Sequence, residues 1–368
     1  MSLPDRIALY SKIEAHRKRP LLVYVTSKRR GAAAHMSSDA LPCIIEQLEA
    51  LPPNTKRLDF LIASLGGDPM TAWRIVSLIR QRVRRFSVLI PQSAYSGATL
   101  LAFGADEIVM HPNGHLGPVD MQISIPSEYG GTKHFSTEEI TAFLDFVRDN
   151  LKITDQEHIR LLFETVCKEI GSLGIGFTAR SQRLAVDLGE RLLALHMKDD
   201  DSRSKLRSLV ENMSRRFQSH SYPINRTEAI DIGLKVSKRN AALESMMWEA
   251  WLDLESELQE RVPFNPLAEL LSSPEASKLL SPIPQFDLPF NTPAPSNFSA
   301  DIDGVKKASV GINPVDFEYK TALIESARVN HAFTHKGKFL SCRTPDLTIQ
   351  CNIVNTFMGW VKQSTDTK

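Results

Sequence analysis

The chain has 368 residues, of which 42% are hydrophobic and 24% charged, and its 44 basic and 43 acidic residues give a net charge of +1. This composition is typical of a folded globular protein, and the balanced charge argues against a surface built to bind nucleic acid or an anionic membrane. No apolar run has the length of a signal peptide or a membrane-spanning helix. We therefore expect a cytoplasmic protein without an integral membrane segment.

Between residues 21 and 110, apolar strand-like runs alternate with helical patterns. Strands are predicted at 21–26, 57–64, 86–91 and 106–110. Helices are predicted at 39–51 and 69–83, with a third beginning near Ser96. This alternation is typical of right-handed β-α-β crossovers and a mostly parallel sheet. The charged stretch with glycine and serine that follows the first strand is predicted to be a mobile loop.

The second half of the chain changes from helices to prolines and then to strands. Helices are predicted at 136–151, 154–170, 177–197 and 202–217. They would form a helical insertion (136–217) within a main domain (21–261) that follows an N-terminal segment (1–20). Eight prolines at 262–295 predict a linker. Alternating residues and a Lys-Gly turn then predict a small antiparallel β module at 296–368.

The four cysteines are spaced too widely to form a recognisable motif. They are Cys43, Cys167, Cys342 and Cys351, and none is part of a CxxC pair. Such spacing favours reduced thiols over a disulfide framework or a zinc site. We expect neither a bound metal nor a cofactor.

Two strand ends carry small residues where ordinary loops would carry larger polar ones. The first is "LIASLGGD", with Gly66 and Gly67, and the second is "PQSAYSGATL", with Ser96 and Gly97. Each alone reads as a tight turn or a helix cap. However, the carboxyl ends of parallel strands meet at one edge of a sheet. Together the turns can place a serine hydroxyl at a helix N-terminus beside unobstructed backbone N–H groups, which predicts an acyl-transfer site.

The stretches "IASLGGDPMTAWRIVSLIR" and "IPQSAYSGATLLAFGADEIVMHPNGHLGPVD" resemble the Clp-fold serine peptidases, in the branch called serine dehydrogenase proteinases (SDH), with SppA and ClpP as distant relatives. The resemblance covers about residues 20–237. It implies an α/β fold, namely a ClpP/crotonase-like spiral of β-β-α units, here with an added helical layer and a small C-terminal β-rich module. It also implies Ser96 as nucleophile, an oxyanion hole formed by the N–H groups of Gly67 and Gly97, and a homo-oligomer.

The relatives of this family differ in the residue that serves as general base. The SDH branch has the order serine, aspartate, histidine and resembles this chain again in "SHSYPINRTEAIDIGLKV". Carried over by motif, Asp120 would orient the imidazole and His220 would act as general base. This chain departs from the family's frequent His-Asp-Tyr-Pro-Ile, because Ser221 follows the histidine. His115 and Lys133 remain alternatives.

These residues predict a serine endopeptidase, a hydrolase that cleaves peptides or unfolded protein segments. Two other functions stay open. A crotonase-like enzyme would aim the same N–H groups at a coenzyme A thioester and would not need Ser96. A catalytically inactive scaffold would keep the fold and bind partners through the C-terminal module.

Overall fold

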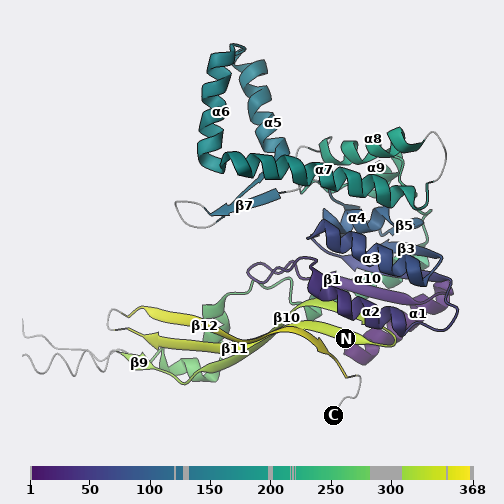
Figure 1. The fold of residues 1–368 in the computed structure, drawn as a ribbon. Helices are drawn as coiled ribbons and strands as arrows, with labels where there is room; N and C mark the ends of the chain where they lie inside the picture. The colour runs from purple at the N-terminus through teal and green to yellow at the C-terminus, as the bar shows by residue number, and fades with distance from the viewer. Residues whose placement is uncertain are drawn as a thin grey trace, which may run out of the picture.

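The largest element of the structure, a computed structural model, is a sheet with the strand order β12-β11-β10-β1-β2-β3-β5 (Figure 1). The structure describes residues 2–119, 122–126, 132–197, 202–215, 217, 219, 221–281, 309–344 and 347–364. The parallel part of the sheet consists of β1 (Leu21–Thr26), β2 (Arg57–Ala63), β3 (Arg85–Ile90) and β5 (Glu107–Met110). The predicted α/β fold with a mostly parallel core is confirmed.

Each parallel strand is apolar on both faces because helices cover both faces of the sheet. In β1, Leu22 and Tyr24 face one core, while Leu21, Val23 and Val25 face the other. The first core is closed by α2 (Leu41–Glu49), α3 (Pro69–Arg82) and α4 (Gly97–Phe103). The second is closed by α1 (Leu3–Arg17) and α10 (Ala241–Glu257).

Helix α1 occupies the N-terminal segment, to which the sequence pattern assigned no element. Charged residues recur every few positions along α1, yet Leu9, Tyr10 and Ile13 lie on one side of the helix and are buried against the second core. This narrow apolar stripe is enough to hold α1 against the sheet, because α10 packs alongside α1. The strands between the two helical layers are thereby shielded from solvent on both faces.

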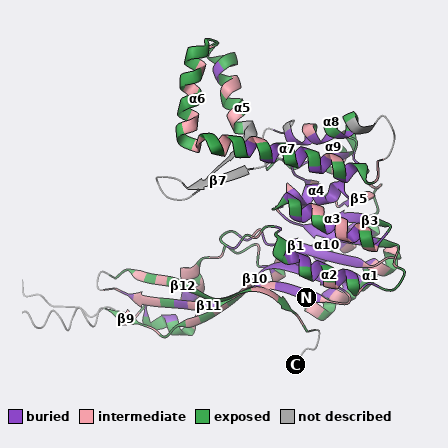
Figure 2. Ribbon diagram, in the orientation of Figure 1, coloured by how far each residue is buried: buried purple, intermediate pink, exposed green. Residues whose placement is uncertain are grey.

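The added helical layer is also confirmed. Its helices are α5 (Thr137–Asp145), the π-helical segment η2 (Phe146–Asn150), α6 (Gln156–Ile170), α7 (Ser172–Ala194), α8 (Ser202–Arg215) and α9 (Arg226–Asp231). The C-terminal part of α7 packs on α3 and α4, whereas α5 and α6 project from the body (Figure 1). Helix α6 has no buried residue, so it appears green and pink in Figure 2.

The C-terminal strands form antiparallel pairs, as predicted, and they also extend the central sheet. They are β9 (Val310–Gly311), β10 (Val315–Ser326), β11 (Asn330–Arg343) and β12 (Ile349–Lys362). Strand β10 pairs antiparallel with β1, so that Leu22 lies opposite Ser326. Beyond this pairing, β10, β11 and β12 continue away from the body as a long arm (Figure 1), hereafter the β10–β12 arm.

The predicted Lys-Gly turn is wrong. Lys336 and Gly337 lie inside β11, where the register to β12 shifts by one residue, and the chain reverses instead between Ser326 and Asn330. A Cβ on Gly337 would lie 2.3 Å from the carbonyl oxygen of Val354. The glycine therefore serves a close approach at a β-bulge, which is the other common use of glycine in strands.

The proline-rich segment is helical where the structure describes it. It forms α11 (Pro266–Leu271) and the 3₁₀ turn η3 (Pro274–Lys278), each with proline in its first turn. Leu270 and Leu279 are buried against Phe339 of the β10–β12 arm. The residues from 282 to 308 lie outside the described part, and the domain boundaries stay predictions.

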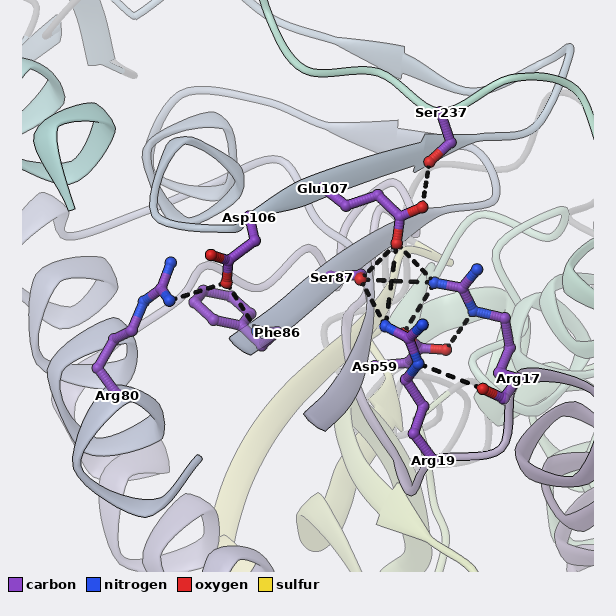
Figure 3. A network of polar contacts seen from close by, with 9 residues as sticks. All are labelled: Arg17, Arg19, Asp59, Arg80, Phe86, Ser87, Asp106, Glu107 and Ser237. Carbon is purple, nitrogen blue, oxygen red and sulfur yellow. Dashed lines mark hydrogen bonds and ion pairs between the residues drawn. The ribbon is translucent and has the colours of Figure 1, made fainter. Parts of the chain in front are cut away.

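A charged network lies at the amino ends of the parallel strands (Figure 3). This edge of the sheet is opposite the edge at which the glycine-containing turns lie. Arg17 donates to Asp59 at 2.7 Å and to Glu107 at 2.8 Å, and Ser87 donates to Glu107 at 2.6 Å. Burial raises the pKa of Glu107, but hydrogen bonds from Ser237, Ser87 and Arg17 outweigh it and lower that pKa to about 2. Glu107 therefore stabilises the fold in its ionised form.

Replacing Glu107 with glutamine is expected to weaken the fold at neutral pH and much less in acid. Because the folded-state pKa is about 2 and the ordinary value is 4.5, the stabilising contribution is complete above about pH 4.5 and disappears as the pH falls towards 2. Urea unfolding midpoints of wild type and Glu107→Gln should thus differ at pH 7 and converge below pH 4.5. A difference that does not change with pH would contradict this role, and Glu275→Gln on the exposed turn η3 is the control.

Candidate active site

The two glycine-containing turns lie next to each other, beyond the carboxyl ends of β2 and β3. Ser64 donates its N–H to Ser93 at 2.9 Å, and Tyr95 donates to the Ser64 carbonyl at 3.0 Å. On the other side, β4 (Ser93–Ala94) pairs in parallel with β6 (His115–Leu116). The short strands β4 and β6 therefore form a small second layer that fixes the two turns relative to each other. The turns meet here because the carboxyl ends of parallel strands lie at one edge of a sheet.

Ser96 is held in a backbone conformation that side chains rarely adopt. It is the residue before α4, with φ 49° and ψ −114°, and its side chain is half-buried. Such a conformation costs on the order of 1–3 kcal/mol and is characteristic of functional sites. Within the described part of the chain, its Oγ does not cap α4 and makes no other hydrogen bond. The turn thus presents a hydroxyl that the described scaffold does not use.

The glycines bring the backbone of one turn against the other. Gly66 and Gly67 have φ of 96° and 144°, and a Cβ on Gly67 would lie 2.2 Å from the Met36 carbonyl oxygen. A Cβ on Gly97 would lie 2.7 Å from the Gly67 carbonyl oxygen and 3.2 Å from its nitrogen. Among the described residues, the N–H groups of Gly67 and Gly97 have no hydrogen-bond acceptor. Two free donors therefore lie beside Ser96.

Two buried hydroxyl side chains, which the sequence analysis did not single out, hold these turns in place. The Ser64 Oγ accepts the Gly66 N–H at 3.0 Å and shares a hydrogen bond of 2.7 Å with Thr26. The Thr99 hydroxyl bonds the carbonyls of Ala94 and Gly117 at 2.7 and 2.9 Å. A serine two residues before a glycine pair is a recognisable turn signal, whereas nothing in the local sequence marks Thr99.

The predicted mobile loop after β1 is partly wrong, because several of its residues are fixed against the site. Arg29 is only 2% exposed, and the Met36 N–H donates to the Gly66 carbonyl at 2.7 Å. The Lys28 Nζ lies 3.3 Å from the Ser93 Oγ and 4.2 Å from the centre of the Trp251 ring. Burial lowers the pKa of Lys28. The charged stretch thus packs beside β4 because its side chains find acceptors and an aromatic face there.

The predicted base and its partner, His220 and Asp120, lie outside the described residues. The structure describes the chain on either side of them. Leu116 and Ile224 exchange both of their N–H···O bonds at 2.9 Å, and Val119 donates its N–H to the Met213 carbonyl at 3.3 Å. The flanking parts of the two segments therefore run side by side.

The alternative base His115 lies in β6, next to the strand that leads to Ser96. It pairs with Ser93, three residues before Ser96. Its Nδ1 bonds the Asn113 carbonyl at 3.2 Å and its ring meets the Tyr95 ring edge-on at 5.4 Å. Burial lowers its pKa. These contacts describe a packed histidine at the side of the turn.

Lys133, the other alternative, lies in β8 (Thr132–Ser136), which pairs antiparallel with β7 (Gln122–Pro126). The structure describes the backbone of these two strands. Among the described residues, no three histidine, cysteine or acidic side chains are placed to hold a metal ion. No helix in the described ranges is both long and apolar enough to cross a membrane.

Comparison with protein families shows that residues 43–130 match the model of the ClpP-like SDH-type serine proteinases. The match includes Gly67, Ser96 and Gly97, and it confirms the predicted resemblance. Two uncharacterized proteins of Methanocaldococcus jannaschii are 23% and 26% identical over 187 residues, which are 51% and 50% of this chain. The chain spans about half the length of these relatives, 54% of each.

Three of the similar solved structures are proteases. A membrane-bound stomatin-specific protease (1510-N) is 14% identical, with a TM-score of 0.34 over 67% of this chain and 89% of the other. ClpP1 from Listeria monocytogenes is 12% identical, with a TM-score of 0.32 over 63% and 98%. The ClpP catalytic domain from Plasmodium falciparum is 13% identical, with a TM-score of 0.33 over 65% and 93%.

Proposed function

We propose that this chain, whose residues 43–130 match the ClpP-like SDH-type serine proteinases, is a serine endopeptidase with Ser96 as its nucleophile. One observation supports the proposal most. Ser96 stands on a strained turn with its hydroxyl unused by the described scaffold, next to the free N–H groups of Gly67 and Gly97. A nucleophile beside two preorganised donors is the arrangement that acyl transfer requires.

In the proposed reaction, the Ser96 Oγ attacks the carbonyl carbon of a peptide bond and forms a tetrahedral intermediate. The Gly67 and Gly97 N–H groups donate to its oxyanion, and each such donor contributes about 3 kcal/mol to transition-state stabilisation. His220, oriented by Asp120 as the resemblance implies, takes the serine proton and passes it to the leaving amine. Water then hydrolyses the acyl-enzyme by the reverse sequence of proton transfers.

The strain at Ser96 favours this function over the crotonase-like alternative. A coenzyme A thioester needs only the two N–H donors, so that a glycine or alanine before α4 would serve equally well. Holding a serine at φ 49° costs folding free energy, which is understandable if the hydroxyl reacts. The substrates we propose are peptides or unfolded protein segments, the working form is a homo-oligomer, and the location is the cytoplasm.

Labelling with a fluorophosphonate probe tests the proposal. The probe should modify wild type on one residue, and mass spectrometry of the labelled peptide should place it on Ser96. Ser93, which is fully buried in the same stretch, serves as the internal control and should stay unmodified. No labelling together with hydrolysis of a coenzyme A thioester would establish the crotonase-like alternative, and absence of both would favour the scaffold.

A further inference from the structure

Strand β12 forms one end of the central sheet and leaves its outer edge open. Its inner edge pairs with β11 from Ile349 to Lys362, and no strand in the described ranges pairs with the other side. About half of the backbone N–H and C=O groups of an edge strand point away from the sheet. At ~3.4 Å per residue, this edge is about 45 Å long.

This edge lacks the features that usually protect edge strands. Between Ile349 and Val361 it has no charged residue and no proline. Its exposed apolar side chains are Ile353 (42%), Val354 (43%), Phe357 (42%) and Met358 (62%). Natural proteins place lysine, proline or inward charges on edges that must not pair with another chain. An uncharged edge of this length is therefore suited to strand pairing.

Two ion pairs lie within the β10–β12 arm. Lys338 lies 2.7 Å from Asp316, and Lys336 lies 3.0 Å from Glu318, each pair joining β11 to β10. Neither pair involves β12. A strongly charged partner would thus find no complementary field along the edge, whereas an uncharged strand would meet no repulsion.

The arm holds β12 in place before any partner arrives. Phe339 on the neighbouring strand is 2% exposed and packs against α11 and η3. At the other end, the Trp360 ring nitrogen donates to Asp39 at 2.8 Å and Lys362 pairs with Glu46. A prearranged edge loses little conformational entropy when it binds, and the end of the arm that carries β9 extends away from the helical body (Figure 1).

We propose that β12 pairs antiparallel with β12 of a second copy of this chain, across a two-fold axis at Asn352. This register uses all of residues 349–355, the regular run that precedes the bulge near Thr356. An uncharged strand is complementary to itself, and two-fold pairing covers both open edges at once and stops at a dimer. The interface lies outside the residues that match the peptidase family, so it does not depend on the proposed activity.

Sedimentation of the full chain at several concentrations tests this interface. Wild type should form a dimer or a larger assembly built from such pairs. In Asn352→Lys the new ammonium groups of two copies would face each other on the axis, so the dissociation constant should rise by about tenfold or more. Asn352→Glu should have the same effect for the same reason. Equimolar Asn352→Lys and Asn352→Glu should associate again.

Leu173→Lys is the matched control, because it adds the same charge to an apolar residue in the first turn of α7 that is 89% exposed. It should keep the wild-type β12 pairing. Circular dichroism checks that each variant is folded. A monomeric wild type, association unchanged in Asn352→Lys, or a mixture of the two charge variants that does not associate would overturn the proposal. Loss of the pairing in Leu173→Lys would overturn it as well.

Discussion

Ser96→Ala is expected to lower the hydrolysis of fluorescein-labelled casein by roughly 10⁴- to 10⁶-fold. The variant lacks the nucleophilic oxygen, while the free N–H groups of Gly67 and Gly97 still bind and polarise a carbonyl. Some acceleration over the uncatalysed reaction should therefore remain. The measurement is kcat/KM for wild type and variant at equal concentrations of folded protein.

The control for this loss is Ser77→Ala. Ser77 lies on α3, where its hydroxyl donates to the Trp73 carbonyl one helical turn earlier. Removing it should leave the rate unchanged. Retention of more than a tenth of wild-type activity in Ser96→Ala would show that another residue is the nucleophile.

Arg6→Leu is expected to destabilise the fold by about 3–5 kcal/mol, because it leaves a buried carboxylate without its cation. Arg6 is fully buried, and it donates two hydrogen bonds of 2.8 Å to Glu325 and a third to Asp253. Tyr10 adds a hydrogen bond of 2.7 Å to Glu325. Glu325 is itself 0% exposed, so water cannot replace the guanidinium.

Urea unfolding at neutral pH, followed by circular dichroism, measures this effect. Arg148→Leu is the control, since Arg148 makes its ion pairs with Asp145 and Asp149 on the surface and exposed pairs contribute little. The midpoint of the control should stay close to wild type. Equal midpoints for both variants would mean that the buried network adds nothing to stability.

The parallel core could be read from the sequence because its signals are local. Strand β1 is a continuous apolar run bounded by charge, and α3 begins with Pro69 after Asp68, whose carboxylate accepts the Met70 and Thr71 N–H groups. Likewise, Gly67 and Gly97 marked the turns, because a glycine at a strand end indicates an unusual backbone or a close approach. Each of these features depends on neighbours in the chain.

The contacts that could not be predicted join residues far apart in the sequence. Arg6 meets Glu325 across 319 positions, and neither residue differs in its local setting from an ordinary surface charge. The pairing of β10 with β1 has no local signature either. Likewise, the sequence suggested a hydroxyl at the site through Ser96 but not its positive φ.

The antiparallel pairing of β10 with β1 has a consequence for biosynthesis. Leu22 is translated some three hundred residues before its partner Ser326. Until then, a strand made of hydrophobic residues has one unsatisfied side, which is a template for pairing between nascent chains. Translation therefore supplies β10, the strand that covers this side of β1, only after the parallel strands β2, β3 and β5.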